Sequence, residues 1–212
     1  MVYVSGFWSL SSTAACVSVG ISLYGVIAYL AGILDGGTRP RMASWVAWCT
    51  ANTVFTAVAY LAGAYLAAGI NAASATMNAA VIALALRRGV SLRPGDNIDW
   101  ACLLSSIACV LVTVEISDKT FGAMLAICAN LIATVPTLRH AWSKPQEETW
   151  QMFAANAFAG ALGVSGVLLA SGYQFASVAG PLITTIGNIG LVALTVGRGR
   201  FAEDAVVPVR VG

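Results

Sequence analysis

Residues 78–89 read Asn-Ala-Ala-Val-Ile-Ala-Leu-Ala-Leu-Arg-Arg-Gly, and residues 188–199 read Asn-Ile-Gly-Leu-Val-Ala-Leu-Thr-Val-Gly-Arg-Gly. The two stretches align without a gap, with Asn, Ala, Arg and Gly at identical offsets. A weaker echo links residues 45–52 with residues 150–156, where a Trp is followed by an Ala-Asn pair in each. These matches predict a chain built from two similar halves, each closing on an apolar helix that ends in Arg and Gly.

The composition indicates a membrane protein. Of the 212 residues, 58% are apolar and only 9% charged, and the mean hydropathy is +0.82. Soluble domains carry charge on about a quarter of their residues, so a water-soluble globule is excluded. The net charge of +2 is too small and too scattered for a nucleic-acid-binding face. The five cysteines lie inside apolar blocks without metal-ligand spacing, so we expect free thiols and no metal site.

Seven apolar segments follow when the chain is divided at its charged, Gly and Pro positions. Each is close to the ~20 residues that a helix needs to cross a bilayer, and backbone groups in lipid must be bonded within their own segment. The sequence therefore predicts an all-α membrane protein with seven transmembrane helices, over residues 10–34, 43–67, 70–87, 100–117, 120–139, 150–171 and 174–196.

The basic residues alternate with these segments. Ten of the eleven lie in the links after segments one, three and five and after segment seven, and only Lys119 lies on the opposite side. By the positive-inside rule the N-terminus is outside and the C-terminus cytoplasmic. We expect a multi-pass protein of the cell membrane, and the Ala- and Gly-rich composition fits a bacterial inner membrane.

Two three-helix units of equal orientation require one extra crossing between them, because three helices end on the side opposite their start. The predicted organisation is 3+1+3 with parallel repeats. The first unit spans 10–89, a linker helix 98–117, the second unit 119–199, and a cytoplasmic tail 200–212.

This pattern resembles the PQ-loop/SWEET-like superfamily. The segments that carry the resemblance are Gly37-Thr-Arg-Pro-Arg-Met-Ala-Ser-Trp45 and Pro136-Thr-Leu-Arg-His-Ala-Trp142, together with the Asn in the third helix of each unit. The resemblance implies a transporter of sugars, amino acids or vitamins whose pocket is lined by Asn78 and Asn188. It also implies a helix-bending hinge at Pro136. The matching stretch of the first unit, residues 29–32, has no proline, and neither half contains a Pro-Gln pair.

Asparagines are the polar residues expected at mid-depth. Asn78 lies about 15 Å from Arg88 along a helix, half the thickness of the bilayer, and Asn188 lies equally deep. Asn52, Asn156 and Asn130 fall at similar depths. The amides either line a pocket for a neutral polar solute or join neighbouring helices by hydrogen bonds. We favour the pocket for Asn78 and Asn188, with Asn52 and Asn156 as a second tier, and the helix-joining role for Asn130.

Trp45, Trp48 and Trp150 fall in the first turns of the second and sixth segments. An aromatic belt at the inner membrane interface is the expected role. For Trp48 the alternative is a stacking wall at the floor of the pocket, since it lies one turn before Asn52.

The expected function is facilitative transport of a small neutral polar solute. No nucleophile has a base at helical spacing, so we expect neither an enzyme nor a cofactor. The absence of a carboxylate at mid-depth argues against proton coupling. The alternative is a non-transporting membrane protein with this fold, acting as receptor, chaperone or assembly subunit. Both of these functions are compatible with a homo-oligomer.

Overall fold

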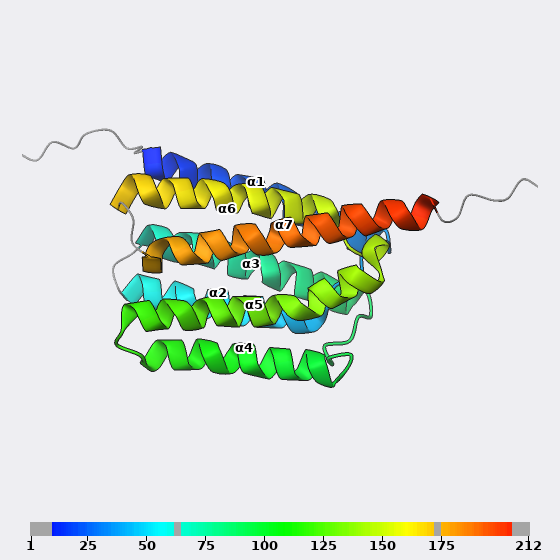
Figure 1. Cartoon of the computed structure of the whole chain (residues 1–212), viewed down its shortest axis with the longest axis horizontal. Coiled ribbons are helices and arrows are strands. Elements are labelled where there is room, and N and C mark those ends of the chain that lie inside the picture. Colours follow the sequence, from blue (N-terminus) through cyan, green and yellow to red (C-terminus); the bar gives the residue numbers. More distant parts are fainter. Residues whose placement is uncertain (1–9, 62–64, 172–174, 205–212) are drawn as a thin grey trace, which may run out of the picture.

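The computed structural model describes residues 10–61, 65–171 and 175–204, and these form a bundle of long helices (Figure 1). The elements are α1 (Leu10–Leu34), α2 (Met42–Leu61), α3 (Tyr65–Arg87), α4 (Asn97–Glu115), α5 (Lys119–Ser143), the short 3₁₀ helix η1 (Pro145–Glu147), α6 (Trp150–Ser171) and α7 (Phe175–Asp204). The predicted all-helical fold with seven long helices is confirmed for the part of the chain that the structure describes. Within that part, four helices are both long and apolar enough to cross a membrane: α1, residues 67–87 of α3, α4 and residues 120–143 of α5.

Several helix ends differ from the sequence prediction, and the largest differences are at the end of α2, the start of α3 and the end of α7. The second segment was expected to reach residue 67, but α2 ends at Leu61 and α3 already begins at Tyr65. Residues 62–64, between the two helices, carry no charge and no proline, so their composition matches that of the helices on either side. The tail expected from residue 200 begins as helix, since α7 continues to Asp204 and no proline lies between residues 200 and 207.

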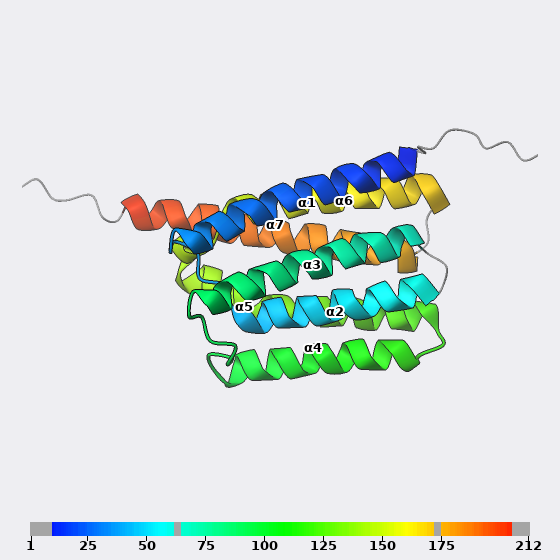
Figure 2. The same cartoon turned by 180° about the vertical axis from the view of Figure 1, so that it is seen from behind.

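Six of the seven helices form a closed ring. Its order, given by the helices that contact one another, is α1, α3, α2, α5, α7, α6 and back to α1. Among the described residues no contact joins α1 to α5, α3 to α7 or α2 to α6, so the members of each of these pairs lie across the ring from each other. Helix α4 lies outside the ring against α2 and α5, at one edge of the bundle in both views (Figures 1 and 2).

Polar side chains within the helices are largely satisfied by their own backbone. Hydroxyl groups donate to the carbonyl four residues earlier, as is usual where no water is available. Residues with this bond include Thr50, Thr53, Thr56, Ser74, Thr76, Thr113, Thr134, Ser165 and Thr195. Fewer bonds cross between helices: Ser18 Oγ donates to the carbonyl of Ala159, and Ser106 Oγ to that of Ala129, both over 2.9 Å.

Close packing of α1 on α6 depends on Gly25. A Cβ atom at this position would lie 2.7 Å from Ala155 Cβ, closer than real Cβ atoms approach a neighbour, and a tight 3.1 Å from Met152 Cα. The absence of a side chain therefore sets the distance between the two helices.

The links at one end of the bundle carry five of the described basic residues: Arg39, Arg41, Arg88, Arg93 and Lys144. We call it the arginine-bearing end. Here the start of α4 is fixed by ion pairs: Asp99, 2% exposed, lies 3.6 Å from both Arg41 and Arg139. Asp96 caps α4 by accepting from the Asp99 N–H and also pairs with Arg139 at 3.0 Å. The hydrogen bond from Arg139 and the bond from the backbone lower the pKa of Asp96 to about 2.

Candidate functional site

A central cavity of about 680 Å³ lies inside the ring. All six ring helices line it, and α4 contributes none of the described lining residues. The lining extends from Ser11, Ala67 and Gly166, near the end opposite the arginines, to Val26, Phe153 and Leu191 deeper in the bundle. The size suits a small metabolite.

Asparagine amides, together with Ser and Thr hydroxyls, supply the polar groups of the cavity. Asn78 of α3 and Asn188 of α7 line it from opposite sides of the ring, and Asn52 of α2 and Asn156 of α6 do the same. Each of these four side chains is only half-buried. The structure thus brings together on one cavity surface the four amides that the sequence analysis singled out.

Two further asparagines line the cavity. Asn130 of α5, expected to join helices, lies in the lining together with Thr134. Asn71 of α3 was not anticipated, although it precedes Asn78 by seven residues and two helical turns separate residues of one face. This seven-residue spacing is the feature of the sequence from which Asn71 could have been predicted to line the cavity.

The hydrogen bonds of the amides leave donors and acceptors available. Asn52 Nδ2 donates to the Trp48 carbonyl at 2.9 Å, and Asn188 Nδ2 donates to the Thr184 carbonyl at 2.7 Å, each within its own helix. The Asn78 side chain has no hydrogen bond within the described part of the chain. An amide has two N–H donors and an oxygen acceptor, so even the bonded pair keep one donor and the oxygen for another partner. None of these bonds joins one helix to another.

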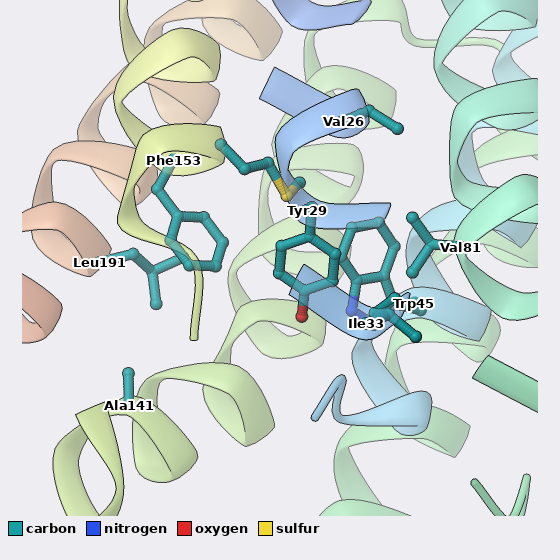
Figure 3. Packing of buried hydrophobic residues seen from close by; sticks show 9 residues of the cluster. Val26, Tyr29, Ile33, Trp45, Val81, Ala141, Phe153 and Leu191 are labelled. Atoms are coloured by element: carbon teal, nitrogen blue, oxygen red, sulfur yellow. The ribbon is translucent and has the colours of Figure 1, made fainter. Parts of the chain in front are cut away.

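An apolar layer closes the cavity toward the arginine-bearing end. We call it the apolar floor. Its nine buried residues are Val26, Tyr29, Ile33, Trp45, Val81, Ala141, Met152, Phe153 and Leu191 (Figure 3). Tyr29 is central to it, with its ring centroid 4.9 Å from that of Trp45 and 6.3 Å from that of Phe153. Since α1, α2 and α6 each supply one of these rings, the aromatic contacts join three helices at the level of the floor.

The tryptophans do not share one role. Trp45 was expected in an interfacial belt, but only 1% of its surface is exposed, because its ring packs between Tyr29 and Trp48. The belt prediction is therefore wrong for Trp45. Trp48 is half-buried and lines the cavity next to the floor, and Trp150 is 46% exposed.

A buried carboxyl group lies on the far side of the floor. The Tyr29 hydroxyl donates to Glu148 Oε2 over 3.0 Å, and Glu148 Oε1 is buried without a hydrogen-bond partner. Removal from water raises the pKa of Glu148 to about 8, although the bond from Tyr29 and the charge of Arg41 oppose the rise. Residue 148 lies between the predicted fifth and sixth segments, and its burial was not predicted, because it depends on how this link packs against α1.

Pro136, the predicted hinge, is buried inside α5. Proline has no N–H and its ring clashes with the preceding turn, so the helix ladder is interrupted there. The next N–H group, that of Thr137, donates to Ser44 Oγ of α2 over 3.3 Å, which ties α2 to α5 at this point.

No family model, no curated protein and no solved structure matches the chain. The site is therefore interpreted from its own geometry, and the family resemblance stays a prediction.

Proposed function

We propose that the chain is a facilitative transporter of a small neutral polar solute, such as a sugar or related metabolite, which binds in the central cavity. The observation that carries the proposal is a cavity of about 680 Å³ whose surface combines half-buried asparagines with an aromatic ring. Amides donate and accept hydrogen bonds without carrying charge, which suits hydroxyl groups of a neutral solute. Trp48 offers an apolar face on which a solute ring would stack.

The proposed architecture is two parallel three-helix units joined by α4, with all seven helices crossing the membrane. The contacts support it, because α3 lies between α1 and α2 just as α7 lies between α5 and α6. In the ring each helix lies opposite the one that would be its repeat partner, so Asn78 pairs with Asn188 and Asn52 with Asn156. With the arginine-bearing end in the cytoplasm, the described state is closed toward the cytoplasm by the apolar floor.

Transport requires the floor to open. Pro136 is proposed as the hinge, because α5 lacks one backbone bond there and its neighbouring N–H group is held by Ser44 of the adjacent helix. Pro136→Ala is expected to slow exchange between the two access states without loss of solute binding. Unchanged transport kinetics would leave Pro136 as a packing residue.

The test is solute flux in liposomes containing the purified protein, over a panel of neutral monosaccharides and related polyols. Asn78→Leu with Asn188→Leu is expected to abolish the flux that the unchanged protein supports. Each lost amide leaves a polar group of the solute unpaired, at a cost of about 1–3 kcal/mol.

The matched control is Ala79→Leu with Ile189→Leu. These are the next residues on the same two helices, both exposed and outside the cavity lining. The control is expected to transport normally. If no solute in the panel is transported or raises the thermal stability of the protein, the non-transporting alternative of receptor, chaperone or assembly subunit replaces this proposal.

A further inference from the structure

A second cavity, of about 750 Å³, lies at the arginine-bearing end. Ile33 belongs to the apolar floor and also lines this cavity, so the floor separates it from the central cavity. Five basic residues line it: Arg39, Arg41, Arg88, His140 and Lys144. Among the described lining residues Glu147 is the single acid. We call this cavity the basic pocket.

Glu147 demonstrates that these side chains gather around an anion. Its Oε1 lies 3.1 Å from Lys144 Nζ and 3.9 Å from Arg39 Nη1, and its Oε2 lies 3.3 Å from His140 Nε2. One carboxylate is thus shared by two cations, Lys144 and Arg39, and lies beside the imidazole ring of His140. The pocket keeps an excess of positive charge after this pairing, since Arg88 has no ion-pair partner in the described part of the chain.

Two buried nitrogen atoms in the basic pocket lack a hydrogen-bond partner. One is Arg41 Nε, on a guanidinium group whose Nη2 lies 3.6 Å from Asp99 Oδ2. The other is His140 Nε2, which lies near Glu147 Oε2 without forming a hydrogen bond, on a side chain only 7% exposed. Buried polar atoms are nearly always bonded, so Arg41 and His140 are side chains of the pocket wall whose polar atoms the described protein groups do not fully satisfy.

We propose that the basic pocket binds a phosphate-bearing anion. The cations approach from three segments, the α1–α2 link, the turn after α3 and the end of α5. A phosphate group has several oxygen atoms around one phosphorus, so it can accept hydrogen bonds from donors that approach from such different directions. The planar carboxylate in the pocket is already supplied by Glu147. The phosphate belongs either to a soluble compound or to a lipid headgroup, since the pocket lies at one end of the bundle.

The position of the pocket gives the bound anion a consequence for transport. It lies directly beyond the apolar floor, on the route by which a solute in the central cavity would reach the arginine-bearing end. An occupant bridging the α1–α2 link to α5 would oppose separation of these elements and keep the floor closed. This consequence rests on the proposed function, whereas the binding itself does not.

The experiment measures binding without transport. In one arm, full-length protein in neutral detergent is unfolded by heat at increasing sodium phosphate, against sodium chloride of equal ionic strength. In the other arm, the protein is placed in phosphatidylcholine nanodiscs with or without phosphatidic acid. Stabilisation by inorganic phosphate identifies a soluble anion as the class of occupant, and stabilisation by phosphatidic acid alone identifies a lipid headgroup.

Arg88→Gln and Lys144→Gln, singly and together, test the pocket. Both side chains are exposed enough to be replaced without unfolding the bundle. Each is expected to weaken binding about tenfold, the loss of one charge-assisted hydrogen bond. Arg87→Gln and Arg93→Gln are the matched controls, because both residues are exposed and lie outside the pocket lining. Equal weakening in the controls, or no stabilisation in either arm, overturns the proposal, and solute binding in the central cavity would be untouched by that result.

Discussion

Glu148 is an acid held where its charge is costly. Only 7% of its surface is exposed, one carboxyl oxygen has no partner, and the other accepts from Tyr29 at the centre of the apolar floor. The groups that affect it are Tyr29 of α1, Arg41 before α2 and Glu147 of η1. With its pKa raised to about 8, the carboxyl is protonated near neutral pH when the floor is closed.

Stability of the closed floor should therefore depend on pH. An unfolded Glu loses its proton near pH 4.5, so between that pH and about 8 the folded protein holds one proton more than the unfolded chain. Stability must then fall as pH rises through this range. We expect a lower thermal unfolding midpoint at about pH 8.5 than at about pH 6, and a smaller difference in Glu148→Gln, which stays neutral.

The control for this prediction is Asp35→Asn, an exposed acid at the same end of the bundle. It should keep the pH dependence of the unchanged protein. A Glu148→Gln protein whose midpoint shifts with pH as much as that of Asp35→Asn would show that Glu148 is not the titrating group.

Some residues of the site could be predicted from nearby sequence, and others could not. Asn52, Asn78, Asn156 and Asn188 could be predicted to share one surface, since their depth follows from helical rise and their pairing from the repeat. The burial of Glu148 and Trp45 could not, because it arises when α1, α2 and α6 pack together. Contacts between residues far apart in the chain cannot be read from the sequence around either residue.

At the scale of elements, the positions of the helices followed from apolar runs, but some of their ends did not. The break between α2 and α3 lies within residues of uniform apolar character, and α7 runs past its basic residues to Asp204. Helix contacts were also not predictable in detail. The approach of α1 to α6 depends on Gly25, one of many small residues in the chain, and nothing in the sequence distinguishes it from Gly20.

These two glycines of α1 give a matched pair. Gly25→Ala places a methyl group against Ala155 and Met152, so we expect a loss of about 1–3 kcal/mol in stability, as found for overpacked sites. A Cβ at Gly20 would meet nothing within 4 Å, and Gly20→Ala should leave stability unchanged or raise it by up to about 1 kcal/mol through helix propensity. Unfolding of the two variants in detergent gives the comparison. Equal stabilities would mean that α6 withdraws from α1 at little cost.

At the scale of the whole molecule, α4 determines the end at which α5 begins. It runs from the arginine-bearing end to the opposite end, so that α1 and α5 begin at the same end (Figure 1). It contacts only α2 and α5 and supplies no described residue to the central cavity. The sequence match between residues 78–89 and 188–199 predicts the need for such a crossing, but the ring in which α3 lies opposite α7 and α2 opposite α6 is visible only in the contacts.

The membrane topology tests this role of α4 directly. Arg93 precedes the helix and Glu115 ends it, and both side chains are exposed. In a background without the native cysteines, Arg93→Cys should react with a membrane-impermeant thiol reagent only after cells are permeabilised, and Glu115→Cys should react in intact cells. Reaction of both positions from the same side would mean that α4 does not cross the membrane. The second half of the chain would then be inverted relative to the first, and the pairing of Asn78 with Asn188 would lose its basis in a parallel repeat.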